Sequence, residues 1–139
     1  MDKKQSILDF IKQQRLLVLS TTHENSKPQA AVIGFGETDN LELIFGTNNA
    51  SRKYKNLKRD PHVAAVIGWD DSRTVQFEGI AEELSPEDLQ LVRDTYWRKN
   101  PKAEAHNATP GQRYFKVRPT WIRYTNIGAK PWDVIEIAF

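Results

Sequence analysis

The chain has no cysteine and only one methionine in its 139 residues. Without cysteine it can form neither disulfide bonds nor thiolate metal sites, and this composition fits a cytoplasmic protein. No apolar run approaches the roughly 18 residues that a membrane-spanning helix needs, so no membrane partner is expected. The opening stretch MDKKQSILDFIKQQ has the spacing of an amphipathic helix and lacks the long apolar core of a signal peptide.

The chain also lacks a large excess of charge of either sign. Its 20 Lys and Arg residues against 18 Asp and Glu residues leave a formal net charge of +2, which is too small to demand a nucleic-acid partner. The histidines, His23, His62 and His106, do not have the spacing of a metal site, and no glycine-rich nucleotide fingerprint is present. The sequence therefore predicts no metal and no nucleic acid, and it identifies no catalytic acid or base.

Short runs with strand character, separated by turn residues, fill most of the chain. Most of their connections are too short for the crossover helices that parallel strands require. The sequence therefore predicts one domain over residues 1–139, mostly β with flanking α-helices, whose antiparallel sheet closes as a barrel. The expected strands cover residues 16–22, 28–36, 41–47, 61–69, 73–84, 114–125 and 132–139, and the expected helices follow Asp2, Ser51 and Ser85.

The segment Phe45–Pro61, FGTNNASRKYKNLKRDP, reads as a strand end, a polar turn and a short helix that a proline stops. Arg52 and Lys53 in the first turn of that helix have the wrong sign for the positive end of its dipole. An anion would compensate them, and the free N–H groups of a helix start suit an anion. A solvated basic face is the plainer interpretation, but the polar approach and the small Ala50 favour a phosphate site.

The order of these segments resembles the FMN-binding split-barrel family typified by pyridoxamine 5′-phosphate oxidase. The resemblance lies in SKPQAAVIGF, LELIFGTNNASRKYKNLKRDPHVAAVIGW and TVQFEGIAEEL, and more loosely in YFKVRPTWIRY. It implies a six-stranded antiparallel split β-barrel, FMN as cofactor, and an oxidoreductase acting on a small-molecule redox substrate. It also implies a homodimer that holds its flavins at the subunit interface.

The resemblance further implies which residues bind the flavin. Its phosphate would be bound by Arg52 and Lys53, with Ser51 beside them, and its ribityl chain would lie along Gly46 and Thr47. The ring would lie over the strand backbone at Ala31, Val32, Ile33 and Gly34. Thr74 would contact the flavin from the other subunit, and Trp132 is the aromatic residue near the C-terminus that would approach it.

The sequence departs from the oxidase itself at the Ala31 position, where the enzyme has arginine, and at the Gly36 position, where it has lysine. It also shows no counterpart of the C-terminal arginine and histidine that bind the substrate phosphate. We therefore expect a relative of the vitamin B6 enzyme with an unknown substrate. The alternatives are a non-catalytic flavin-binding or flavin-sensing stress protein, or the same barrel holding a deazaflavin or haem.

Overall fold

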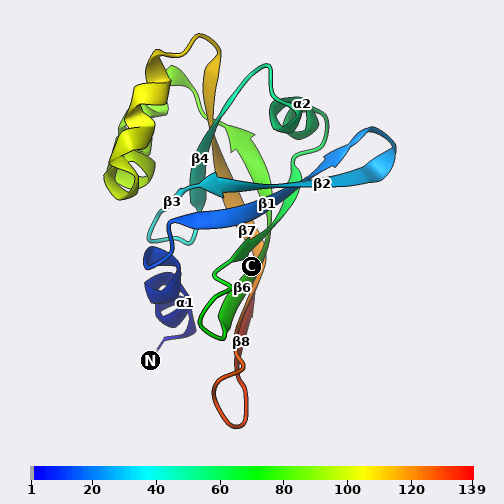
Figure 1. Ribbon diagram of the computed structural model, residues 1–139, viewed down its shortest axis with the longest axis vertical. Coiled ribbons are helices and arrows are strands. Elements are labelled where there is room, and N and C mark those ends of the chain that lie inside the picture. The colour runs from blue at the N-terminus through cyan, green and yellow to red at the C-terminus, as the bar shows by residue number, and fades with distance from the viewer. Residues whose placement is uncertain (1) are drawn as a thin grey trace.

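The computed structural model describes residues 2–139, and its strands form one antiparallel sheet in the order β2-β1-β5-β6-β7-β4-β3, with β8 paired to β7 (Figure 1). The strands are β1 (Leu16–His23), β2 (Lys27–Gly34), β3 (Gly36–Glu37), β4 (Leu43–Asn48), β5 (His62–Ile67), β6 (Arg73–Glu83), β7 (Gln112–Asn126) and β8 (Asp133–Ala138). The helices are α1 (Lys3–Lys12), η1 (Glu24–Ser26), α2 (Arg52–Arg59), η2 (Pro86–Asp88), α3 (Leu89–Val92), η3 (Arg93–Trp97) and η4 (Pro101–Ala108). The predicted mostly β, antiparallel architecture with flanking helices is confirmed.

The two outer strands of the sheet, β2 and β3, follow each other directly along the chain. Phe35, which is fully buried, is the residue between them. β2 pairs with β1 at one edge of the sheet, and β3 pairs with β4 at the opposite edge. The sheet therefore curls into a half-barrel until its first and last strands meet at Phe35.

The sheet has eight strands, two more than the six-stranded barrel that the resemblance implies. Buried Phe35 breaks the predicted strand 28–36 into β2 and the two-residue β3. β7 is 15 residues long and extends beyond its partner β4. β8 pairs with the remaining part of that edge, Trp121–Asn126, because β6 occupies the other edge of β7.

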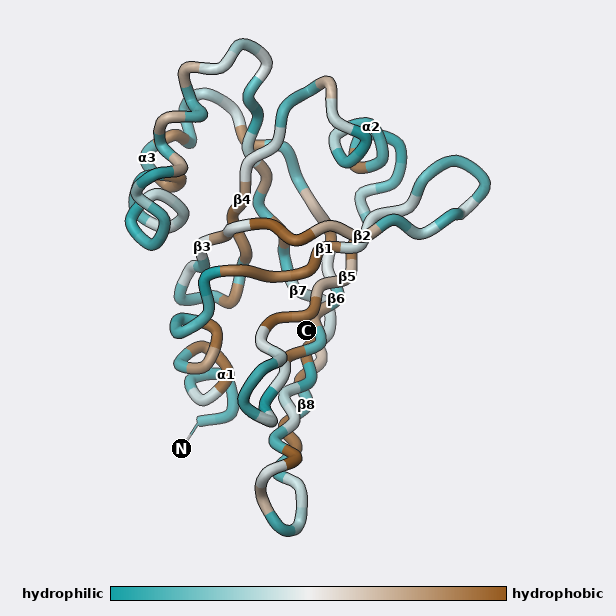
Figure 2. The backbone as a smooth tube through the Cα atoms, viewed as in Figure 1, coloured by the Kyte–Doolittle hydropathy of each residue, from teal (hydrophilic) through white to brown (hydrophobic). Residues whose placement is uncertain are grey.

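The core lies inside the curl of the sheet and is dominated by aromatic and branched aliphatic side chains. Phe45 and Phe115 are directly opposite on β4 and β7, and their rings stack with centroids 5.5 Å apart. Figure 2 shows hydrophobic residues concentrated along β1 and β4, whereas α2 and the tip of the β1–β2 hairpin are hydrophilic. Helix α1 is capped as predicted, because Asp2 accepts a hydrogen bond from the Lys4 backbone N–H at 3.1 Å.

The helical run from Pro86 to Lys99 is less regular than the single helix that the sequence predicts. It begins as the 3-10 turn η2, continues as α3 and widens into the π turn η3. Gly36 lies against that π turn, where an added Cβ would be 2.4 Å from the backbone of Thr95 and Tyr96. The wider turn is thus the place where helix and strand backbones touch. None of the helices in residues 2–139 has the length and apolar content needed to cross a membrane.

Candidate functional site

A groove of about 240 Å³ lies where the first turn of α2 meets β1 and β2. The start of α2 and the two strands supply all of its lining residues. These are Leu19, Thr21, Gln29, Ala30, Ala31, Ser51, Arg52 and Lys53. The groove thus joins the basic helix start to the strand that the resemblance places beneath a flavin ring.

Ser51, at the helix opening that the sequence predicts, is the N-cap of α2. Its backbone is extended, and its Oγ accepts a hydrogen bond from the Tyr54 N–H at 3.1 Å. Thr47 Oγ1 lies 2.8 Å from Ser51 Oγ, so the end of β4 and the helix cap share one hydrogen bond. The backbone N–H groups of Arg52 and Lys53, at the first two helical positions, have no acceptor within the helix.

Two cations extend from this helix start. The guanidinium of Arg52 contacts the side-chain amide of Gln29 on β2. Lys53 is half-buried, and burial lowers the pKa of its ammonium group. Within residues 2–139, no ion pair involves either cation. Because a desolvated, unpaired ammonium is unfavourable, an anion in this groove would be stabilised.

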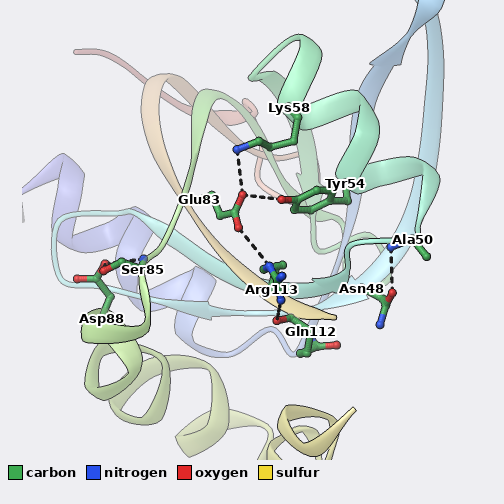
Figure 3. Close-up of polar contacts among 9 residues, drawn as sticks. All are labelled: Asn48, Ala50, Tyr54, Lys58, Glu83, Ser85, Asp88, Gln112 and Arg113. Carbon is green, nitrogen blue, oxygen red and sulfur yellow. Dashed lines mark hydrogen bonds and ion pairs between the residues drawn. The ribbon is translucent and has the colours of Figure 1, made fainter. Parts of the chain in front are cut away.

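Helix α2 is fixed to the sheet from its other side by Glu83, at the end of β6 (Figure 3). Glu83 Oε1 accepts hydrogen bonds from the Tyr54 hydroxyl at 2.9 Å and from Lys58 Nζ at 3.0 Å, while Oε2 lies 3.6 Å from Arg113 Nε. Partial burial alone would raise the pKa of Glu83, but these donors and charges outweigh it and lower the pKa. The carboxylate therefore stays ionised and holds the helix that carries Arg52 and Lys53.

The four predicted residues of β2 do not share one environment. Ala31 lines the groove, and Ile33, on the same side of the strand, packs against the core. Val32 points to the opposite side and is 59% exposed. Gly34 faces Tyr96, whose ring would be 3.6 Å from an added Cβ.

Three further predicted residues lie outside the groove of their own chain. Gly46 is covered by β7 side chains, since an added Cβ there would be 2.7 Å from Gln112 Nε2. Thr74 pairs with Thr125 at the end of β6 that is remote from Glu83. Trp132 precedes β8 and is 60% exposed. A single chain therefore leaves Thr74 and Trp132 away from the helix start.

The outward face of the sheet carries an apolar strip. Val18 on β1 is directly opposite both Val32 and Val66, so these three side chains form a row across β2, β1 and β5. Val66 is 38% exposed. The next row, Ala30, Ser20, Ala64, Glu78 and Trp121, lines a shallow hollow of about 410 Å³, so one charged residue lies beside the apolar ones. Exposed apolar surface of this kind is typical of an interface with another protein chain.

Several uncharged residues of the groove are not among those predicted from the sequence. Thr21 and Gln29 line it, and Asn56 lies beneath them with 2% of its surface exposed. A signal was present, because Thr21 follows Leu19 at the two-residue spacing of one strand face. Asn56 gave no comparable signal, since an asparagine within a basic helix is usually taken as surface.

Two other features of the molecule do not form a comparable site. A larger hollow of about 520 Å³ beside Tyr114 and Leu89 shares no residue with the groove, and its Tyr114 hydroxyl already donates to Asn107. Within the described residues 2–139, no three His, Asp or Glu side chains converge as a metal site. His23 contacts Asn56 at 3.1 Å, and His62 contacts Asp60 at 2.8 Å.

Comparison with known proteins gives the family of the chain. A family profile described as "Pyridoxamine 5'-phosphate oxidase" matches residues 4–126. The pyridoxine/pyridoxamine 5′-phosphate oxidase of Ehrlichia ruminantium is 36% identical over 81 residues, which are 58% of this chain and 42% of that protein. The protein of the same name from a Cyanothece species is 32% identical over 99 residues, which are 70% of this chain and 45% of the relative. The chain therefore spans less than half the length of these curated relatives.

Solved structures agree on the fold. General Stress Protein 26 from Bacillus anthracis is 27% identical with a TM-score of 0.73, covering 89% of this chain and 94% of that one. A heme binding protein from Mycobacterium smegmatis has a TM-score of 0.82 at 15% identity, covering 96% of this chain and 57% of its own. At that identity the similarity concerns the fold alone. Because the matched residues 4–126 include the whole groove and most of the sheet, the chain belongs to the pyridoxamine 5′-phosphate oxidase family.

Proposed function

We propose that this protein binds FMN in the groove at the start of α2 and acts as an oxidoreductase on a small-molecule redox substrate. The observation that carries the proposal is the half-buried Lys53 beside Arg52, neither of which forms an ion pair within residues 2–139. A phosphate monoester brings nearly two negative charges and three acceptor oxygens. It therefore matches two cations at a helix N-terminus.

The residues present fit the rest of the cofactor as well. The hydroxyl groups of Ser51 and Thr47, 2.8 Å apart, border the same helix start. Ala31 lines the groove with a small side chain, which leaves the β2 backbone open to a flat ring. These residues would bind the phosphate and orient the ring, and FMN, when bound, supplies hydride or electron transfer.

The proposal includes a homodimer. The row of Val32, Val18 and Val66 on the outward face offers an apolar surface that a second copy would cover. Thr74 and Trp132 lie outside the groove of their own chain, so in this proposal the second subunit supplies them. Each flavin would then lie between two subunits, which excludes water from the ring more completely than one chain could.

Binding of a flavin without turnover is the second candidate. The groove-lining residues include no carboxylate and no histidine, so the proposal assigns them no proton transfer. Steady-state turnover with reduced nicotinamide and common electron acceptors would exclude this candidate. Mass spectrometry of the released ligand separates FMN from a deazaflavin or haem, and haem is disfavoured because no histidine is among the residues that line the groove.

Reversal of both charges, Arg52→Glu with Lys53→Glu, tests the phosphate site. We expect a loss of at least ~2 kcal/mol of FMN binding free energy, because one charge-assisted hydrogen bond is worth about 1.5–3 kcal/mol. The measurement is a fluorescence titration of the apoprotein with FMN. Arg98→Glu with Lys102→Glu, two exposed positions on the helical run and η4, is the control for net charge. Unchanged affinity in the first variant, with the fold intact, would remove the proposed phosphate site.

A further inference from the structure

A chain of uncharged side chains connects the interior of the protein to Arg52. The side-chain amide of Asn56, which is 2% exposed, lies 3.0 Å from Thr21 Oγ1 and 2.9 Å from the amide of Gln29. The second polar atom of the same Asn56 amide lies 3.1 Å from His23 Nδ1. Gln29 in turn contacts the guanidinium of Arg52, with its amide 3.3 Å from Arg52 Nε and in contact with Nη2 as well.

The guanidinium decides how the Gln29 amide is oriented. Arginine offers only donors, so the carbonyl oxygen of Gln29 faces Arg52 and its amino group faces Asn56. The side-chain amide of Asn56 must then point its carbonyl oxygen at the Gln29 amino group. In that orientation Asn56 still contacts Thr21, Gln29 and His23. The Thr21 hydroxyl can donate as well as accept, and His23 Nδ1 can accept. One consistent arrangement thus fixes both amides.

This arrangement has two consequences for Arg52. The Gln29 oxygen accepts from Nε and Nη2, so it holds one edge of the guanidinium and leaves the remaining N–H groups for the groove. Gln29 is also neutral, so the positive charge of Arg52 is positioned but not cancelled. A carboxylate at the same place would position the arginine equally well and neutralise it.

We propose that Gln29, held by the buried Asn56, is the residue that positions Arg52 for a ligand phosphate, and that its neutrality makes the groove select phosphorylated ligands over their unphosphorylated forms. This inference rests on the proposed function, because it specifies how the same groove recognises FMN. Gln29 is a positioning residue in this proposal. Arg52 and Lys53 make the contacts to the phosphate.

The test compares Gln29→Glu and Gln29→Ala with the wild-type protein, each titrated with FMN and with riboflavin. Glu is isosteric with Gln and adds one negative charge beside Arg52. We expect Gln29→Glu to raise the FMN dissociation constant about tenfold, equivalent to ~1.4 kcal/mol, while riboflavin affinity stays unchanged. Gln29→Ala keeps the charge of Arg52 but frees its side chain, so we expect a smaller, still phosphate-specific loss.

The controls separate positioning from folding and from net charge. Lys102→Gln on the exposed part of η4 changes the net charge by the same amount and should leave both affinities unchanged. Thermal denaturation of each variant shows whether the fold is intact. Equal weakening of FMN and riboflavin, or FMN affinity unchanged in both Gln29 variants, would overturn the inference.

A second readout needs no flavin. In NMR spectra of the apoprotein, we expect the Arg52 Nε–H to be protected from exchange in the wild type and unprotected in Gln29→Ala. Inorganic phosphate should shift that signal in the wild type and leave it unshifted in Gln29→Glu. If the wild type takes up neither flavin, the proposed function fails, and these signals alone then decide whether Gln29 positions Arg52. An unprotected Arg52 Nε–H in the wild type would reject that role.

Discussion

Gly34 and Gly36 lie two residues apart, at the end of β2 and the start of β3, and face the helical run 86–99 at very different distances. A Cβ at Gly34 would be 3.6 Å from the Tyr96 ring, which is an ordinary contact. A Cβ at Gly36 would be 2.4 Å from the backbone of Thr95 and Tyr96. The small residue at Gly36, where the oxidase has lysine, therefore has a structural reason in this protein.

We expect Gly36→Ala to lower the free energy of unfolding by about 2 kcal/mol or more, because overpacking against backbone costs about 1–3 kcal/mol and the π turn cannot move aside freely. Gly34→Ala is the matched control and should change it by less than ~0.5 kcal/mol. Urea denaturation followed by circular dichroism measures both. Similar losses in the two variants would mean that the π turn does not depend on the close approach at Gly36.

The charged residues of the groove and its uncharged residues differ in how well the sequence predicts them. Ser51, Arg52 and Lys53 can be predicted as site residues from the local sequence. A serine at a helix start and two cations directly after it form a pattern that a few neighbouring residues reveal. Gln29 and Asn56 are 27 residues apart in sequence and meet only because β2 returns beneath α2. No local pattern could join them.

At the scale of elements, α2 is held between two different attachments. Its start faces β1 and β2 across the groove, and its far side is attached to β6 by Tyr54 and Lys58 through the single carboxylate Glu83. Weakening the contacts of that carboxylate should therefore make the helix that carries the proposed phosphate site more mobile.

Protonation of Glu83 should weaken this attachment at low pH. Its folded pKa lies below the ordinary value of 4.5, so the stabilisation is present above that pH and is lost as the pH falls through the folded pKa. We expect Glu83→Gln to cost about 1 kcal/mol of unfolding free energy at pH 7, because hydrogen bonds to a partly exposed charge are screened. The difference from wild type should shrink as the solution is acidified below pH 4.5.

Chemical denaturation at a series of pH values measures this difference. Glu82→Gln is the matched control, because Glu82 is the exposed neighbour on the same strand. A difference between wild type and Glu83→Gln that stays constant with pH would show that the carboxylate does not depend on its charge to hold α2.

For the whole molecule, the apolar strip is exposed, and two residues of the proposed site lie far from the groove of their own chain. Val32 and Val66 are exposed, and Thr74 and Trp132 lie away from the groove. A homodimer would cover the first pair and bring the second pair to a flavin.

We expect Val66→Lys to raise the dimer dissociation constant about a hundredfold, or ~3 kcal/mol, because it places a charge within the apolar row of the proposed interface. FMN affinity should fall with it, since the second subunit completes the site. Analytical ultracentrifugation and FMN titration give the two readouts. Ala105→Lys, on the exposed surface of η4, adds the same charge elsewhere and should change neither. A wild-type protein that stays monomeric and still binds FMN would remove the dimer from the proposal.

The fold class, the positions of most strands and the helix start at Ser51 follow from the amino-acid sequence alone. Alternation, turn residues and caps act over a few neighbouring residues, so they can be recognised without the fold. The predicted strand 28–36 is interrupted at Phe35 in the structure. Phe35 is buried where the sheet closes on itself, and that burial depends on the whole barrel, not on the neighbouring residues.

The three-dimensional fold is what brings the side chains of the groove together. It placed Gln29 against Arg52, set Asn56 in the interior and left Thr74 and Trp132 at a distance. The physical reason is that strand pairing joins residues far apart in sequence, and the curl of the sheet selects which faces meet. The two cations of the groove can therefore be predicted from the local sequence. The amides of Gln29 and Asn56, the first of which contacts Arg52, can be identified only from long-range packing.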